Sequence, residues 1–308
     1  MMRERVFLTL VITVALVCTV GFFRPDSVTN ATQERWFWTW KTHSERKCDV
    51  VIVGDSRIYR GLSPDSMREV LPGYRIINFG YSSGSLSPLM LAEAEKRLDV
   101  RGRRTIILGI TPNAMTPKAS KDEHYLQEKN RAMSEIVENL YIIPLMHFLE
   151  PTTPIRLFRE TEREKTENRE EFYENGWVAT RKEPLDPAEA IASYANAFTD
   201  NRVSTHLIEN VIVQTGKWVR EGIRVYAFRP PTTPEMRELE SLLSGFDEKD
   251  FLDRLGKAGG IWIPVSLQEY RSYDGSHLDK ENAKRLSVRI AEIIKRREEG
   301  LKAGANPE

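Results

Sequence analysis

The chain has 308 residues with 45 basic and 45 acidic side chains, so its formal net charge at pH 7 is zero. This length is enough for one large or two ordinary domains with a full core. Balanced charge argues against a generic nucleic-acid-binding protein, which needs a basic surplus, so no nucleic-acid partner is expected. With 40% hydrophobic and 29% charged residues and 2 cysteines, the composition also excludes a disordered, collagen-like or disulfide-scaffold protein.

The N-terminus carries an uncharged apolar run from Val6 to Phe23, preceded by Arg3 and Arg5. The run is at the lower limit of length for a helix that spans a bilayer. Basic residues before it favour a cytoplasmic N-terminus and an exported body. We therefore expect residues 1–24 to be a transmembrane anchor and the rest to lie on the extracytoplasmic side, periplasmic or at the cell surface. A cleaved signal peptide with a secreted product is the main alternative, although no clean Ala-x-Ala site follows, and a buried core helix is a third.

Aromatic residues are concentrated in the juxtamembrane segment 25–47, at Trp36, Phe37, Trp38 and Trp40. Aromatic rings are favoured at the membrane interface. They are equally suited to packing this segment against a folded domain. The sequence leaves both interpretations open.

From residue 48 onward, short apolar runs alternate with amphipathic stretches. The runs are rich in β-branched residues, as strands buried on both faces are, and lie at 49–54, 74–78, 104–109, 222–228 and 260–264. Helices are expected between and after them, starting at Ser63-Pro64 and Ser87-Pro88 and covering 203–220 and 279–297. This alternation predicts an α/β domain over residues 48–299 with a parallel sheet and right-handed crossovers.

The alternation is interrupted between residues 114 and 200, where no clear buried strand is present. Residues 131–140 have a helical pattern, and the charged run 159–171 is typical of a solvated helix face. We therefore expect a mostly helical insertion that covers a site, as long excursions in compact domains often do. The tail 300–308 is expected to be disordered.

Two segments at the ends of predicted strands carry groups suited to nucleophilic catalysis. Ser56 follows the first strand in the sequence Gly-Asp-Ser, and ligands of open parallel sheets collect at the carboxyl ends of the strands. Asp274 and His277 lie three residues apart before the last helix, a spacing at which the carboxylate can fix the imidazole tautomer. Serine needs such a base because it is a poor nucleophile on its own. Each segment alone has an ordinary structural explanation, a turn serine or a surface histidine.

Taken together and in this order, the two segments resemble those of the SGNH (GDSL-type) hydrolase family, over about residues 49–295 with two insertions. The resemblance implies a three-layer α/β/α sandwich around a flavodoxin-like parallel sheet. It also implies that Ser56 is the nucleophile, His277 its base and Asp274 the carboxylate that holds the histidine.

The oxyanion-binding positions of that family are matched less closely. A glycine is usual after the second strand, and here Ser83 stands at its spacing with Gly84 one residue later. An asparagine is usual after the third strand. Here Thr111 stands at the strict position, and Asn113, which we favour, follows two residues later. Loss of one such donor costs about 2.7–4 kcal/mol of transition-state stabilisation, so a catalytically weak or inactive protein is a real alternative.

The resemblance implies an extracytoplasmic serine esterase or O-acyltransferase acting on acyl, foremost acetyl, esters of a cell-envelope polysaccharide or similar carbohydrate. The expected partners are the membrane through the N-terminal helix, the acyl-ester or carbohydrate substrate and envelope-polysaccharide assembly proteins. One alternative is an SGNH-like binding or assembly protein without efficient chemistry. Another is a flavodoxin-like nucleotide binder, which leaves the Asp-x-x-His segment unexplained.

No metal or cofactor is expected, because the sequence lacks metal-ligand motifs and glycine-rich phosphate loops. Two arginines, Arg57 and Arg229, lie just beyond the ends of predicted strands. An anionic substrate group is one possible partner for them, but we expect surface arginines with a structural role.

Overall fold

The computed structural model describes residues 2–23, 30–121, 124–149 and 168–304. The chain divides into two compact units, one made of residues 1–40 and 131–166 and the other of residues 41–130 and 167–308. The second unit contains the predicted α/β region. The described residues 131–149 of the predicted insertion cluster with the N-terminal unit.

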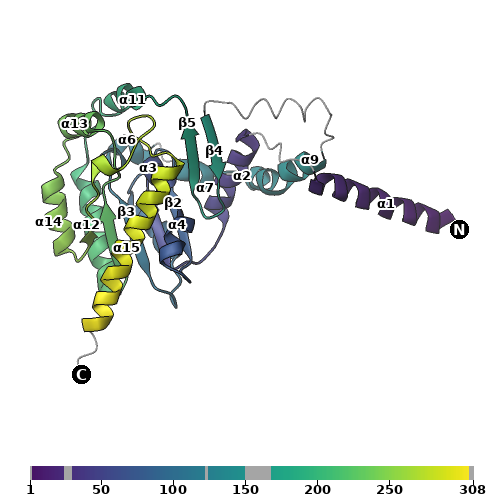
Figure 1. Ribbon diagram of the computed structural model, residues 1–308, viewed down its shortest axis with the longest axis horizontal. Helices are drawn as coiled ribbons and strands as arrows, with labels where there is room; N and C mark the ends of the chain where they lie inside the picture. Colours follow the sequence, from purple (N-terminus) through teal and green to yellow (C-terminus); the bar gives the residue numbers. More distant parts are fainter. Residues whose placement is uncertain (1, 24–29, 122–123, 150–167, 305–308) are drawn as a thin grey trace. The chain divides into compact units, whose positions relative to one another are not determined.

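The second unit is built on a five-stranded sheet, seen in Figure 1. Its strands are β1 (Val50–Gly54), β2 (Ile76–Gly80), β3 (Thr105–Gly109), β6 (Arg224–Phe228) and β7 (Ile261–Trp262). They run in the order β2-β1-β3-β6-β7 and every neighbouring pair is parallel. The prediction of an α/β fold with a parallel sheet is confirmed, and the carboxyl ends of the strands share one edge.

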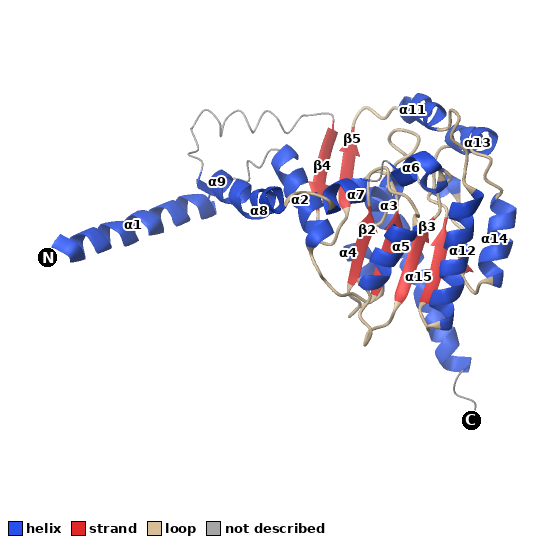
Figure 2. Cartoon of the chain, turned by 180° about the vertical axis from the view of Figure 1, so that it is seen from behind, coloured by secondary structure: helices blue, strands red, loops and turns tan. Residues whose placement is uncertain are grey.

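Helices cover the sheet in two groups. On one side α3 (Ser56–Gly61) and α4 (Pro64–Val70) contact the last helix, α15 (Lys280–Gly304), while α12 (Thr205–Arg220) contacts α5 (Pro88–Lys96) and α14 (Glu248–Lys257). The crossovers from β1 to β2 and from β2 to β3 run in opposite directions, so right-handed connections place α4 and α5 on opposite faces. The two figures view the molecule from opposite sides: α15 lies in front of the sheet in Figure 1, and α12 lies in front of it in Figure 2.

Helix starts follow the sequence signals closely. Ser63 and Ser87 cap α4 and α5 by accepting hydrogen bonds from Ser66 N (3.3 Å) and Met90 N (3.2 Å), each with proline at the next position. A serine oxygen at this position satisfies an amide that the helix leaves unpaired, and proline loses nothing there. The expected caps are therefore present.

Glycines at strand ends bring α3 close to the sheet. A Cβ on Gly54 would lie 2.4 Å from Ile58 Cγ1, and one on Gly109 would lie 2.0 Å from Ile58 Cδ1. Ile58 is fully buried in this position. The absence of side chains at the two glycines thus lets the helix that starts at Ser56 pack directly on the carboxyl ends of β1 and β3.

An antiparallel hairpin, β4 (Asn168–Phe172) and β5 (Val178–Lys182), was not expected from the sequence. The interpretation of 159–171 as a helix is wrong for 168–171, which form β4, while 159–167 lie outside the described residues. Cross-strand pairing decides the structure here, since Val178, the partner of Phe172, is buried. The turn docks on β2, where Asn78 N donates to Asn175 O at 2.8 Å.

The remaining elements of this unit are short. They are α6 (Pro117–Lys121), α7 (His124–Lys129), α11 (Glu189–Ala197), α13 (Pro234–Leu243), and the 3-10 turns η1 (Asn113–Met115) and η3 (Leu267–Glu269). Helix α15 continues to Gly304, so the part of the expected disordered tail up to that residue is helical. Residues 305–308 lie outside the described residues.

The N-terminal unit is helical where it is described. It contains α1 (Met2–Phe23), most of α2 (Asn30–His43), α8 (Met133–Val137), the π-helical turn η2 (Glu138–Ile142) and α9 (Ile143–Leu149). Within it Phe37 and Trp38 are buried, and Trp36 stacks on Trp40 with ring centroids 5.6 Å apart. The four aromatic residues between 36 and 40 thus lie together on α2.

The expected transmembrane helix is not found. Residues Val6–Phe23 do lie in a helix, α1, and its described apolar side chains are exposed. Three charged residues, Arg3, Glu4 and Arg5, occupy its first turns and shorten its apolar part. Among the described residues, no helix combines the length and the hydropathy that crossing a bilayer requires.

Candidate active site

Ser56 is the first residue of α3 and follows the end of β1. The preceding Asp55 caps the helix, with its Oδ1 accepting from Arg57 N at 3.0 Å and its carbonyl from Ile58 N at 3.0 Å. Asp55 and Arg57 are buried, whereas Ser56 between them is partly exposed. The cap thus turns the serine hydroxyl outward at the carboxyl edge of the sheet. The Ser56 amide has no hydrogen-bond partner among the described residues.

The loop that leads into α15 folds around the carboxylate of Asp274. Its Oδ1 accepts from the backbone amides of Ser276 at 2.8 Å and His277 at 2.7 Å. Gly275 between them has a φ of +92°, and a Cβ there would lie 2.1 Å from Pro187 O, so only glycine fits this turn. The loop closes with a bond of 3.0 Å from Tyr273 N to His277 O.

The structure brings the serine, the histidine and the aspartate together. His277 Nε2 lies 2.8 Å from Ser56 Oγ, and His277 Nδ1 lies 2.6 Å from Asp274 Oδ2. The side chains of His277 and Asp274 are 14% and 12% exposed, so the pair lies at the surface of the edge but is largely shielded from water. The Tyr273 ring stacks on the imidazole with centroids 5.9 Å apart. The side chains of Ser56 and His277 are thus within hydrogen-bond distance of each other, as the sequence interpretation requires.

The charge of Asp274 determines the tautomer of His277. Burial opposes ionisation of this carboxyl, but hydrogen bonds from the His277 ring and from the two backbone amides outweigh it and lower its pKa to about 2. An ionised carboxylate only accepts hydrogen bonds, so the imidazole proton lies on Nδ1. The lone pair of Nε2 therefore faces the Ser56 hydroxyl, as a general base requires.

The loop after β2 contains the first pair of oxyanion candidates, Ser83 and Gly84. Gly84 N donates to Tyr81 O at 3.0 Å, and Ser83 has a φ of +48°, as the third residue of a type II turn does. The Gly84 amide is thus already used. The exposed Ser83 carries an amide for which the described part of the chain offers no acceptor, so the geometry favours Ser83 as donor.

Gly84 instead holds the loop against the serine segment. A Cβ at this position would lie 2.7 Å from Gly54 O and 3.2 Å from Asp55 Cα. The loop therefore lies directly beside the residues that precede Ser56. Its other end is attached to the loop after β3, because Leu86 N donates to Ala114 O at 3.0 Å.

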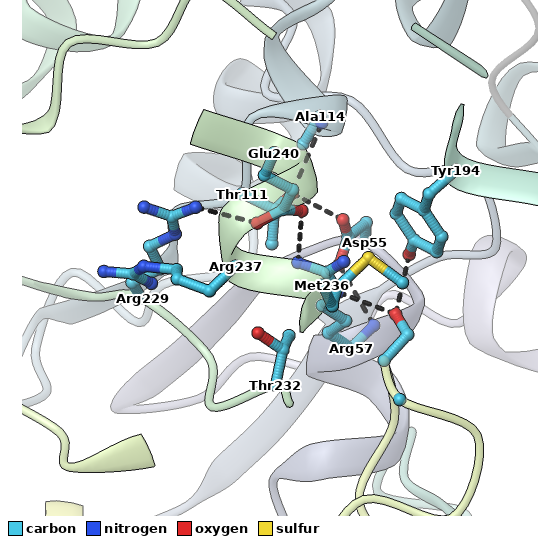
Figure 3. A network of polar contacts seen from close by, with 12 residues as sticks. Asp55, Arg57, Thr111, Ala114, Tyr194, Arg229, Thr232, Met236, Arg237 and Glu240 are labelled. Atoms are coloured by element: carbon cyan, nitrogen blue, oxygen red, sulfur yellow. Dashed lines mark hydrogen bonds and ion pairs between the residues drawn. The ribbon is translucent and has the colours of Figure 1, made fainter. Parts of the chain in front are cut away.

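The loop after β3 contains the other pair, Thr111 and Asn113. Thr111 is fully buried, its hydroxyl donates to Asp55 Oδ2, and it accepts from Ala114 N at 3.3 Å (Figure 3). This hydroxyl supports the cap of α3 and is not free to bind substrate. Asn113 is partly exposed, and in the described residues its side-chain amide has no hydrogen-bond partner. The structure thus leaves Asn113 as the available side chain.

Burial has a further effect on Asp55, whose carboxyl is fully enclosed. Loss of hydration raises its pKa, although Arg57, the Thr111 hydroxyl and the Arg57 amide act in the opposite direction. A carboxylate in such a site is retained only when it is well hydrogen-bonded. Asp55 is therefore a buried acid whose ionised form is penalised overall, although its neighbours offset part of the cost.

Arg57 and Arg229 are not surface arginines, which corrects the sequence-based expectation. Both are buried and bind the two oxygens of Glu240, Arg57 Nη1 to Oε1 and Arg229 Nη2 to Oε2, each at 2.7 Å. Figure 3 shows the two guanidinium groups converging on this carboxylate from opposite sides, with Arg237 nearby. Arg229 also pairs with Glu248, which binds Arg237 at 2.7 Å. Neither arginine is available to bind an anionic substrate group.

Sequence reasoning missed three residues that surround the site: Glu240, Ser276 and Tyr194. Glu240 is fully buried on α13, 183 residues from its partner Arg57, and nothing in its local sequence distinguishes it from a solvated glutamate. Ser276 lies within the Asp-x-x-His segment, directly before His277, and that position is the signal that could have identified it. Over the residues that the structure describes, no group of His, Cys, Asp and Glu side chains is arranged to hold a metal ion.

Comparison with known proteins adds little. No family model matches the chain, and no curated protein matches it either. Among solved structures, one described as a candidate platelet activating factor from Streptococcus pneumonia superposes with a TM-score of 0.38 and 13% identity, covering 84% of this chain and 92% of that chain.

Proposed function

We propose that this protein is a serine esterase or O-acyltransferase of the SGNH type, with the three-layer sandwich of that family. The observation that carries the proposal is the continuous hydrogen-bond path from Asp274 through His277 to Ser56. Its two separations, 2.6 and 2.8 Å, are within the range for proton transfer. The residues come from opposite ends of the domain and meet at the edge where parallel sheets bind ligands.

In the proposed reaction, His277 Nε2 takes the proton of the Ser56 hydroxyl as Oγ attacks the acyl carbonyl. The tetrahedral oxyanion is stabilised by the backbone amides of Ser56 and Ser83 and by the side chain of Asn113. Collapse of the intermediate breaks the ester bond, and the leaving alcohol takes the proton from His277. The acyl group then passes from Ser56 to water, or to a sugar hydroxyl, with His277 again accepting the proton of the attacking group.

The proposed substrate rests on the sequence resemblance alone. We propose acetyl esters of a cell-envelope polysaccharide or similar carbohydrate as substrates, and envelope-polysaccharide assembly proteins as partners. The proposed extracytoplasmic location rests on Arg3 and Arg5 before the apolar run. A reporter fused after residue 308 that is active only outside the cytoplasm tests it. Activity on the cytoplasmic side would exclude this location.

A fluorophosphonate probe tests the chemistry directly. The wild-type protein should become labelled, and Ser56→Ala and His277→Ala should not. Matched controls are Ser241→Ala and His206→Ala, whose side chains are exposed on α13 and α12 and bond only within their own helices. Labelling that persists in Ser56→Ala, or is absent from a folded wild type, would contradict the proposal.

A binding or assembly role without efficient chemistry is the second candidate. It is favoured by the departures at the oxyanion positions, where Ser83 replaces the usual glycine and the Thr111 hydroxyl is occupied by Asp55. This candidate predicts no labelling and no turnover of activated acetyl esters, together with carbohydrate binding that survives Ser56→Ala. Turnover that is lost in Ser56→Ala would exclude it.

Hydrolase and transferase differ in what receives the acyl group. With an activated acetyl ester and an added oligosaccharide, a transferase should form acetylated sugar faster than acetate. A hydrolase should release acetate at a rate that the sugar does not change. The ratio of the two products at several sugar concentrations distinguishes them.

A further inference from the structure

We propose that Arg57 is a positioning residue that holds residues 272–278, the His277 loop, against α3, the helix that begins at Ser56. Arg57 directly follows the serine, and Ser276 directly precedes the histidine. Arg57 Nε donates to Ser276 Oγ at 2.8 Å, so one side-chain hydrogen bond joins segments that are 219 residues apart in the sequence. The catalytic part of this inference rests on the proposed function, whereas its structural part does not.

The hydroxyl of Ser276 is held from both sides. It accepts from Arg57 and donates to the Tyr194 hydroxyl of α11 at 3.0 Å. The residue is fully buried, and its backbone amide donates to Asp274 Oδ1 at 2.8 Å. Ser276 therefore fixes the carboxylate that orients His277, and its own orientation is set by Arg57.

Arg57 is in turn held in place by a charge that is completely buried. Its Nη1 donates to Glu240 Oε1 at 2.7 Å, and its guanidinium lies over the Tyr194 ring, 4.6 Å from the centroid (Figure 3). Burial disfavours ionisation of Glu240, but Arg57 and Arg229 outweigh this and lower its pKa. The carboxylate is thus a fixed anion that holds the arginine in a single orientation.

The geometry requires the fork of a guanidinium. Arg57 donates at the same time to Ser276 through Nε and to Glu240 through Nη1, in two different directions within one plane. A lysine presents a compact ammonium group on a flexible stem and does not reproduce a planar fork. Arg57→Lys therefore retains the charge but should lose one of the two contacts.

The consequence for catalysis lies in the separation of Ser56 and His277. A misplacement of about 1 Å in a catalytic group can lower the rate by about 10²-fold. Arg57 is 2% exposed, so it does not reach a substrate bound at the surface of the site. Loss of the hydrogen bond between Arg57 and Ser276 should therefore lower kcat and leave KM nearly unchanged.

The kinetic test compares Arg57→Lys, Ser276→Ala and the double variant with Arg229→Lys. Arg229 binds the other oxygen of Glu240 and is also buried but does not contact the His277 loop, so it is the matched control. We expect kcat to fall by roughly 10- to 100-fold in both single variants. The kcat of the double variant should be no lower than that of the less active single variant, because both changes break the same contact. Arg229→Lys should retain kcat.

Hydrogen exchange of the loop peptide 272–278 provides a readout that needs no activity. The amides of Ser276 and His277 donate to Asp274 Oδ1, which should protect them from exchange in the wild type. They should exchange faster in Arg57→Lys and Ser276→Ala and remain protected in Arg229→Lys. A wild type without turnover would refute the proposed function, and the exchange rates would still decide this inference. Unchanged exchange in Arg57→Lys, or an equal loss of protection in Arg229→Lys, would overturn it.

Discussion

Replacing Asp274 by asparagine tests the assigned proton positions most sharply. The asparagine oxygen can still accept from the amides of Ser276 and His277, so the loop should keep its conformation. Its NH₂ group would donate to His277 Nδ1 and move the imidazole proton to Nε2. That nitrogen would then face Ser56 without a lone pair. A change of this kind in a serine triad lowers kcat by about 10⁴-fold.

The effect on stability follows from the pKa of Asp274. Folding lowers it from 3.8 to about 2, and one pKa unit is equivalent to about 1.36 kcal/mol, so the ionised carboxylate gains roughly 2 kcal/mol in the folded protein. Because the folded value lies below the unfolded one, this stability is complete above about pH 4 and is lost as the pH falls towards 2. The difference in unfolding free energy between wild type and Asp274→Asn should shrink over the same interval.

The assay combines the rate of turnover of an activated acetyl ester with urea unfolding at several pH values. Asp279→Asn is the matched control, since Asp279 caps the start of α15 by accepting from Asn282 N at 2.8 Å and asparagine is an equally good cap. It should retain both activity and stability. Turnover by Asp274→Asn within about tenfold of the wild-type rate would refute the assignment of the tautomer.

Four further variants test the rest of the site. Asn113→Ala should lower kcat by about 10²–10³-fold with little change in KM, if its amide stabilises the oxyanion, and steady-state kinetics measures the split. Gly84→Ala should reduce activity and stability because its Cβ would lie 2.7 Å from Gly54 O, whereas Ser83→Gly should keep activity and change the unfolding free energy by less than about 1 kcal/mol, since glycine tolerates positive φ. Asp55→Asn should gain stability relative to wild type as the pH rises above 4, because burial raises the pKa of Asp55 and penalises its ionised form; a pH-independent difference in urea unfolding would contradict this.

Some of the site could be predicted because its residues are tied to strand ends. The apolar run before Ser56 is a central strand, and the Asp-x-x-His segment precedes a helix with clear periodicity, so both fall at the edge where parallel strands end. The identity of the oxyanion donors could not be decided in the same way. It depends on the φ of Ser83 and on the bond of the Thr111 hydroxyl to Asp55, which only the folded loops determine.

The rest of the architecture depends on contacts between distant segments. Residues Arg169, Glu170 and Glu171 are typical of a solvated helix, but they form strand β4 because they pair with β5. The burial of Arg57 depends on Glu240, far away in the sequence, and an arginine without its partner resembles a surface residue. Such long-range pairs leave no periodicity in the sequence.

Trapping the acyl intermediate tests the central claim most directly. After a short reaction with an activated acetyl ester, rapid acid quenching and peptide mass spectrometry should locate a single acetyl group on Ser56. The modification should be absent from His277→Ala under the same conditions. An acetyl group found on other residues, or one that forms on Ser56 equally fast without His277, would contradict the account.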